Sequence, residues 1–397
     1  MRPEVPPAEP LGPSTQGWES IRRLGGWQAF LVNCPMLEEV YEQHKGAWCS
    51  AWSTSLRRWK EATSTYDKDT ALMWLSFWAQ GLQRKPSRGG RQGRVELASR
   101  YNCVVEEDWA GLVERWQRDK FKREEKSAAR RDRQDRDSEE YEQRELAKQR
   151  RNVVGLIEAG QLGKAMGRVT SFGLGDIRDQ AVKEQLSEKF PPRQRTLPEC
   201  VARIRPIDSF RNLRGSLLAL NPGTAAGAGG IKNEYLIAFG ERMEEHELKL
   251  FEEFALAYSA GKLPHWFYKV FQSLQTVAPF KDNGKEAVRP LGLKNSMVKM
   301  FNKEVVSQSK PEIRDFLEPV QLGISIAGPA LLTRSVSGVM EAFQDYICFR
   351  LDLKNVFNEI SRRSILDVLD SEEMNQTSIV SKRFFSIKSI YYDYDYS

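Results

Sequence analysis

Apolar residues recur at helical spacing over most of the first hundred residues of the chain. The segment WCSAWSTSLRRWK supplies one such stripe: Trp48, Trp52, Leu56 and Trp59. Spacings of four, four and three residues place these side chains on one helix face. An aromatic stripe can stack on nucleic-acid bases, but it more often belongs to a core, and we expect the core role here. The pattern predicts a Trp-rich helical region over 18–104, after a proline-rich, disordered segment over 1–17.

Two polar stretches interrupt the apolar periodicity. The first, QRKPSRGGRQGR, mixes arginines with glycines and is interpreted either as a phosphate-binding loop or as a flexible, solvated linker. Its basic residues are Arg84, Lys85, Arg88, Arg91 and Arg94. The second stretch has opposite charges three and four residues apart, which stabilise an exposed helix. We therefore expect a charged helical connector over 105–152, followed by a second globular region.

A β-hairpin is predicted within the second region. In QTVAPFKDNGKEAVRPLGL, two short apolar runs over 276–280 and 287–293 flank the turn sequence Asp-Asn-Gly. Asn-Gly readily adopts the positive φ angles that tight turns require. Lys281 and Arg289 fall near the mouth of this hairpin. The alternative for both cations is a solvated hairpin tip.

Helices are predicted on both sides of the hairpin. Before it, the glycine-rich segment LNPGTAAGAGGIKNEYL fits neither the phosphate-loop nor the dinucleotide-binding pattern, so we expect a surface loop leading into a helix near Asn233. After it, Ser296 is the expected N-cap of a further helix. One face of that helix is apolar and consists of Met297, Met300, Phe301 and Val305.

The segment FRLDLKNVFNEISR places a carboxylate at the end of an alternating run. The residues on one face of the predicted strand are Ile347, Phe349, Leu351 and Leu353, and those on the other are Cys348, Arg350 and Asp352. A helical pattern follows. A carboxylate held rigidly at a strand exit suits a metal ligand. The alternative is that Asp352 caps the next turn or pairs with Arg350 or Lys354.

Composition narrows the class of protein. The chain has 397 residues, a net charge of +6 and 40% hydrophobic residues, which indicates a soluble protein with a mild preference for anionic partners. Its five cysteines and three histidines are scattered, which argues against a disulfide framework and a cysteine or histidine zinc site. No apolar run reaches the ~20 residues of a membrane span, and no signal peptide is evident. We expect an intracellular protein, nuclear or cytoplasmic, without membrane contact.

Four segments stand in an order that resembles a known family: the glycine-rich loop, the basic hairpin, the segment EPVQLGISIAGPALL and the strand bearing Asp352. Together they resemble the reverse transcriptase of non-long-terminal-repeat retrotransposons, an RNA-directed DNA polymerase. The resemblance implies an α+β fold: a mostly helical N-terminal part, then right-hand polymerase fingers with a β-hairpin, and an incomplete palm. Fingers are expected over 153–340, the first palm strand and helix over 341–370, and a divergent tail over 371–397.

The resemblance also implies roles for particular residues. Asp352 would bind two Mg²⁺ or Mn²⁺ ions, with the backbone carbonyl of Leu353 assisting on the triphosphate side. Phe357 would lie beneath the incoming sugar and select deoxynucleotides, although core packing also accounts for a phenylalanine there. Lys281 and Arg289 would hold the triphosphate. The implied partners are an RNA template, a DNA primer and a deoxynucleoside triphosphate.

The pattern of the family is interrupted after its first palm motif. No aromatic-x-Asp-Asp hairpin follows, and Asp393 and Asp395 in the tail lie too close to Asp352 and lack a return strand. We expect a truncated copy whose metal site is incomplete. Two hypotheses follow: an enzyme by descent that is catalytically inactive, or a non-catalytic nucleic-acid-binding or interaction protein. A third interpretation, an unrelated helical scaffold, requires the order of the motifs to be coincidence.

Overall fold

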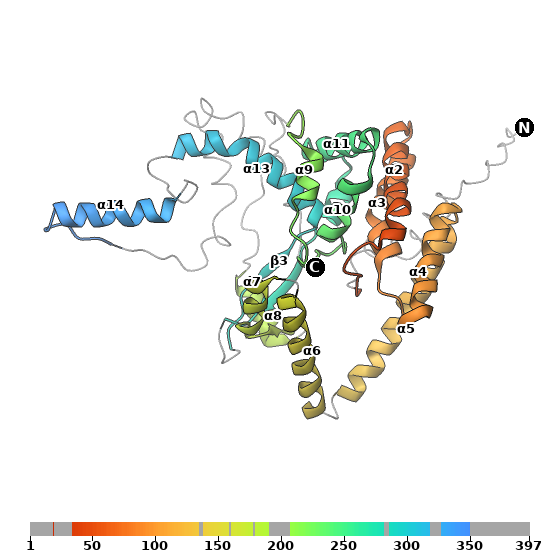
Figure 1. Ribbon diagram of the computed structural model, residues 1–397, viewed down its shortest axis with the longest axis horizontal. Coiled ribbons are helices and arrows are strands. Elements are labelled where there is room, and N and C mark those ends of the chain that lie inside the picture. Colours follow the sequence, from red (N-terminus) through yellow and green to blue (C-terminus); the bar gives the residue numbers. More distant parts are fainter. Residues whose placement is uncertain are drawn as a thin grey trace, which may run out of the picture.

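The computed structural model describes residue 19 and residues 34–134, 138–158, 160–177, 179–189, 207–281, 286–317 and 327–349. Over these residues the protein is mostly helical and contains a small three-stranded antiparallel sheet (Figure 1). The helical character and the hairpin expected from the sequence are confirmed. The polymerase fold and the domain boundaries stay predictions.

The first helices form a Trp-rich unit. Its elements are the short 3₁₀ helix η2 (Glu42–His44) and helices α2 (Lys45–Glu61), α3 (Thr65–Gln83), α4 (Gly90–Val105) and α5 (Trp109–Gln134). The stripe on α2 is part of the core, as predicted: Trp48, Trp52 and Leu56 are fully buried, and Trp59 packs against the core from its edge. Because Trp48 and Trp52 have no exposed surface, they cannot stack on bases in this fold.

The charged connector is helical over most of its length. Helix α5 covers its first part, and α6 (Ser138–Glu158) covers its second. The first two turns of α5 are not solvated, however, because Trp109, Leu112 and Trp116 are buried in the Trp-rich core. Two short helices follow, α7 (Leu162–Val169) and α8 (Gln180–Lys189).

A second set of helices precedes and follows the hairpin in the sequence. They are α9 (Leu213–Leu218), α10 (Asn233–Arg242), α11 (Glu245–Ser259), α12 (His265–Gln272), α13 (Ser296–Leu317) and α14 (Gly328–Ala342). Helix α14 lies at the left of Figure 1, apart from the other helices, and its apolar side chains are exposed.

The Trp-rich unit and the second set of helices share one hydrophobic core. The Trp48 ring stacks on Phe239 of α10, with ring centroids 5.5 Å apart and planes 7° apart. The Trp48 Nε1 donates to the carbonyl of Tyr235 at 3.1 Å, and the Tyr235 hydroxyl donates to the carbonyl of Leu37 at 2.6 Å. The two regions therefore pack as one body around Trp48.

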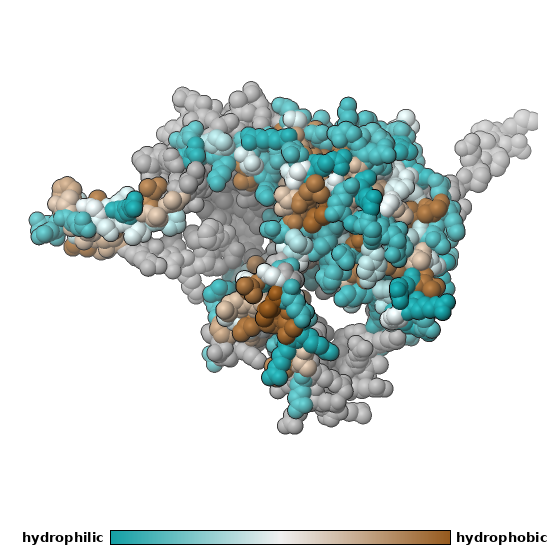
Figure 2. Space-filling model, in the orientation of Figure 1, coloured by the Kyte–Doolittle hydropathy of each residue, from teal (hydrophilic) through white to brown (hydrophobic). Residues whose placement is uncertain are grey.

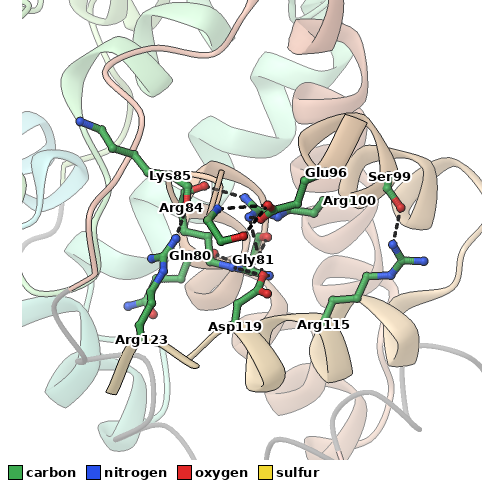
Figure 3. Close-up of polar contacts among 11 residues, drawn as sticks. Gln80, Gly81, Arg84, Lys85, Glu96, Ser99, Arg100, Arg115, Asp119 and Arg123 are labelled. Atoms are coloured by element: carbon green, nitrogen blue, oxygen red, sulfur yellow. Dashed lines mark hydrogen bonds and ion pairs between the residues drawn. The ribbon is translucent and has the colours of Figure 1, made fainter. Parts of the chain in front are cut away.

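A buried ion-pair network holds α3, α4 and α5 together (Figure 3). Arg84, only 2% exposed, donates through Nη2 and Nε to Asp119 Oδ2 at 2.5 and 3.1 Å, and through Nη1 to two carbonyls of α3. Arg100 donates to the carbonyl of Arg84 and pairs with Glu96. The interpretation of QRKPSRGGRQGR as a flexible linker is therefore wrong at two places. Arg84 is the buried C-terminal cap of α3. The residues from Gly90 on form the start of α4.

The sheet is small and antiparallel in order β1-β2-β3. Strand β2 (Gln275–Pro279) pairs with β3 (Leu291–Leu293), and β1 (Leu174–Gly175) pairs with the other edge of β2. Strand β1 was not predicted, since two residues are too short for alternation to be recognised.

The start of α13 corrects a detail of the sequence analysis. Asn295, rather than Ser296, is its cap: the Asn295 Oδ1 accepts from the backbone N–H of Met297 at 2.9 Å. Ser296 is the first helical residue and is fully buried. The predicted apolar face of this helix is confirmed, because Met297, Met300, Phe301 and Val305 all belong to the core.

Candidate nucleic-acid interface

The hairpin keeps a single register from its base to Lys281. Thr276 pairs with Gly292, and the isolated bridge between Phe280 and Val288 continues the same register toward the tip. Backbone hydrogen bonds of 2.8 Å run from Lys281 N to the carbonyl of Ala287 and from Arg289 N to that of Pro279. Both predicted cations therefore lie on paired backbone rather than on a loose tip.

The alternation of the strands puts the two cations on the same face. Ala278, Phe280 and Val288 point to the face covered by α8, where they form a small core with Val182. Lys281 and Arg289 have the opposite parity and are exposed. Residues in this diagonal relation lie roughly 7 Å apart between their Cα atoms. The hairpin thus presents an ammonium and a guanidinium side by side.

Exposed leucines share the sheet face of these cations. On the same face, Leu174 of β1 is 63% exposed and Leu291 of β3 is 50% exposed. Figure 2 shows apolar surface gathered below the centre of the view, over the lobe that contains α6 and α7. The exposed apolar side chains of these two helices include Leu146, Val154, Ile157, Leu162, Met166 and Val169. Cations beside apolar surface suit a ligand that carries both phosphates and flat apolar groups.

Helix α8 holds the hairpin rigid from behind. The Gln185 side chain accepts from Val288 N at 3.0 Å and donates to the carbonyl of Glu286 at 2.7 Å. Its amide thus makes the two hydrogen bonds that the backbone of a neighbouring strand would make. Lys189 also donates to the carbonyl of Val288. The sequence pattern does not indicate a role for Gln185 or Lys189, because their partners lie about one hundred positions away.

The glycine-rich loop packs against the start of α13. A Cβ added at Gly227 would lie 2.4 Å from Asn295 N and from the carbonyl carbon of Lys294, so only glycine allows this approach. Gly227, Gly229 and Ile231 are buried. The loop leads into α10 at Asn233 and its first residues are exposed, both as predicted, whereas its centre is buried against the residues that follow the hairpin.

Two further lysines stand at this junction. Burial, and then the nearby charge of Lys299, lowers the pKa of Lys294. Burial also lowers the pKa of Lys299. An anion bound near both would relieve their repulsion and raise both pKa values. The sequence pattern alone gives these lysines no role; its one signal is that they stand five residues apart across a predicted helix start.

The predicted metal and sugar contacts lie outside the described residues: Asp352, Leu353 and Phe357. The strand that would carry Asp352 is described only as far as 349, and there Ile347 and Phe349 are exposed and belong to no strand of the described sheet. The described residues contain no group of three histidine, cysteine or carboxylate side chains that could hold a metal ion. None of the described helices is long and apolar enough to cross a membrane.

Comparisons of the chain with protein-family models, with curated proteins and with solved structures found no match. The resemblance to retroelement polymerases therefore rests on the order of the motifs in the sequence alone.

Proposed function

We propose that this chain is a reverse-transcriptase domain of retroelement origin, and that its hairpin binds the phosphates of a nucleotide or a nucleic acid. The observation that carries the proposal is the pair of exposed cations, Lys281 and Arg289, on the hairpin face opposite the one that α8 packs against. The resemblance assigns the triphosphate contacts to these two residues.

The two cations have complementary chemistry. Lys281 offers a point charge that adapts to many phosphate positions, and Arg289 offers a planar fork that binds two oxygens at once. Lys294 and Lys299 add positive charge at the start of α13. Backbone pairing and the contacts of α8 fix the strands, so little ordering of the main chain would oppose binding.

The proposed metal ligands are inferred from the sequence alone. Mg²⁺ prefers carboxylate and carbonyl oxygens, which Asp352 and Leu353 would supply, and Phe357 would select the deoxy sugar. A two-metal site needs more carboxylates than Asp352 alone, and the family's further palm motif has no counterpart in this sequence. The alternative function, nucleic-acid binding without catalysis, uses the same hairpin.

Primer extension distinguishes the two functions. We expect no incorporation of deoxynucleotides on an RNA template with Mg²⁺ or Mn²⁺, because one matching carboxylate cannot hold two ions. The measurement compares the chain with its Asp352→Ala variant. Incorporation that is lost in the variant would contradict the expectation and establish a working polymerase. Incorporation retained in the variant would point to a contaminating enzyme.

Removing the hairpin cations should weaken phosphate binding in a salt-dependent way. For Lys281→Gln and Arg289→Gln, we expect the slope of log K against log salt to become shallower by roughly 0.7 to 0.9 per lost phosphate contact. Fluorescence anisotropy of a labelled primer–template measures the slope, and competition by a deoxynucleoside triphosphate tells whether the hairpin holds nucleotide or polymer.

Lys249→Gln is the matched control for these variants, since Lys249 is an exposed lysine on α11 and the charge change is the same. An unchanged slope in both hairpin variants, with both shown to be folded, would refute the proposed phosphate contact.

A further inference from the structure

Four exposed cations stand at every third position of the segment that leads into α4. They are Lys85, Arg88, Arg91 and Arg94. The segment over 85–95 contains no aspartate and no glutamate, so its charged side chains are all positive. We call Arg88, Arg91 and Arg94 the arginine cluster.

The local structure holds the arginine cluster together. Arg88 donates through Nη1 to Gln92 Oε1 at 3.2 Å, so its guanidinium lies against the first turn of α4. Arg91 and Arg94 are three positions apart on the same helix and therefore share one face. At 3.6 residues per turn, Arg91 falls between Gln92 and Arg94 around the helix axis. The three guanidinium groups are consequently neighbours at the start of α4.

The carboxylate nearest to the cluster in the sequence is paired with a buried charge. Glu96 pairs with Arg100, which is 1% exposed, and Figure 3 shows the two side chains directed at each other. Glu96 Oε2 also accepts from Ser87 N at 3.0 Å. The buried network contains two arginines and two carboxylates, so its net charge is zero: Arg84, Arg100, Asp119 and Glu96. It therefore leaves the charge of the arginine cluster uncompensated.

The chain before α2 carries two further carboxylates. Met36 forms an antiparallel bridge with the residue before Lys85, so the chain runs away from the arginine cluster as it continues to Glu38 and Glu39. Glu38 lies 2.7 Å from Lys232 and 3.6 Å from Lys85. Because Glu38 offsets part of the charge of Lys85, this lysine is not included in the proposed site.

Helix α5 runs antiparallel to α4 and carries the exposed carboxylates Glu114 and Glu125. Glu114 is next to Arg115, which contacts α4 more than one turn beyond the arginine cluster. Glu125 is two positions beyond Arg123, which donates to the carbonyl of Lys85, and positions two apart on a helix do not face each other. Within the part of the chain that the structure describes, the arginine cluster forms no ion pair. The cluster is thus a local excess of positive charge.

We propose that the arginine cluster binds the phosphodiester backbone of a nucleic acid without reading its bases. A guanidinium fork binds two phosphate oxygens at once, and three such forks suit a partner with repeated phosphates. The segment over 84–96 has no aromatic side chain that could stack on bases. Its exposed large apolar side chain is Val95 alone, which provides neither the apolar centre of a protein interface nor an anchor in a membrane. The inference goes beyond the proposed hairpin contact, because this surface requires neither Lys281 nor Arg289.

The test is binding of the labelled primer–template to the full chain, by fluorescence anisotropy over a range of salt concentrations. The cluster variant combines Arg88→Gln, Arg91→Gln and Arg94→Gln. We expect its slope of log K against log salt to become shallower by roughly 0.7 to 0.9 per lost phosphate contact, and so by roughly 2 to 3 in all. The corresponding triple lysine variant should keep the slope of the wild type, because the slope depends on the number of charges.

The matched control combines Arg57→Gln, Lys68→Gln and Lys249→Gln. These cations are also exposed but are scattered over α2, α3 and α11, and the total change in charge is the same. We expect the slope to change by less than one phosphate contact. An unchanged slope in the cluster variant, with circular dichroism showing that it is folded, would overturn the proposal. An equal loss of slope in the control would overturn it too, because only the overall charge would then matter.

Two competitors test the class of partner. Duplex DNA should displace the primer–template, whereas a polyglutamate peptide at equal charge should displace much less, and equal displacement by polyglutamate would overturn the proposal in favour of an acidic protein. Binding to phosphatidylserine vesicles that is lost in the cluster variant, while the primer–template slope stays unchanged, would assign the arginines to a membrane surface and overturn it as well.

The hairpin variants separate this inference from the proposed function. A shallower slope in the cluster variant, with unchanged slopes in Lys281→Gln and Arg289→Gln, would support the arginine cluster and refute the hairpin contact. The reverse pattern would refute the arginine cluster alone. Unchanged slopes in all of these variants would refute both.

Discussion

Asp119→Asn should lower the free energy of unfolding by about 3 kcal/mol, because it leaves two buried arginines without their shared carboxylate. Asp119 Oδ2 accepts two hydrogen bonds from Arg84 and lies 3.7 Å from Arg100 Nη2. Burial, followed by repulsion from Arg100, already lowers the pKa of Arg84 to about 10. Without Asp119, the charge of Arg84 has only main-chain carbonyls as partners among its described contacts. Chemical denaturation followed by circular dichroism measures the loss.

Glu125→Gln is the control for this prediction. It neutralises an exposed carboxylate on the same helix, and we expect a change within about 0.5 kcal/mol. Asp119 is 20% exposed, so water reaches part of the pair and the expected cost lies at the lower end of the range for buried ion pairs. A loss below about 1 kcal/mol would show that water replaces Asp119 as the partner of Arg84.

The elements with local determinants were predictable from the sequence. Helix α10 begins at Asn233, and the hairpin forms where the apolar runs flank Asn-Gly, because periodicity and turn chemistry act within a few residues. The aromatic stripe of α2 is in the core for a similarly local reason: spacing alone gathers its rings on one helix face.

The features that the sequence analysis missed depend on residues far apart in the chain. Arg84 and Arg91 look alike within one basic stretch, yet Arg84 is buried because α5 brings Asp119 to it from 35 positions away. Likewise, Gln185 supports the hairpin across about one hundred residues. Spacing within a segment carries no information about such partners, so charge pattern alone could not separate a structural arginine from a surface one.

In the candidate site, too, some residues were predictable from the sequence and some contacts were not. The sequence singled out Lys281 and Arg289, and pairing across the strands explains why both reach one face. It did not reveal that Gly227 packs against Lys294, because contact between two loops is set by how α10 and α13 pack. The roles of Asp352, Leu353 and Phe357 stay predictions of the motif order.

Trp48→Ala should lower the free energy of unfolding by about 4 kcal/mol, because it removes the side chain on which the two regions of the core meet. The fully buried indole stacks on Phe239 and donates to the Tyr235 carbonyl, so its loss leaves a cavity and removes a buried hydrogen bond. Since one core spans both regions, we expect fluorescence and circular dichroism to report the same shift in a single transition.

Trp59→Ala is the matched control, since Trp59 lies on the same helix but packs only at the edge of the core, edge-on to Phe254 at 5.6 Å. Its loss should cost about half as much, because a partly exposed site admits water and leaves no sealed cavity. If Trp48→Ala instead produced two separate transitions, the indole would be the element that couples the Trp-rich unit to the hairpin-bearing helices. A single transition at reduced stability would assign the coupling to the whole interface, including the Tyr235 hydrogen bond to Leu37 and the ion pair between Lys45 and Glu241.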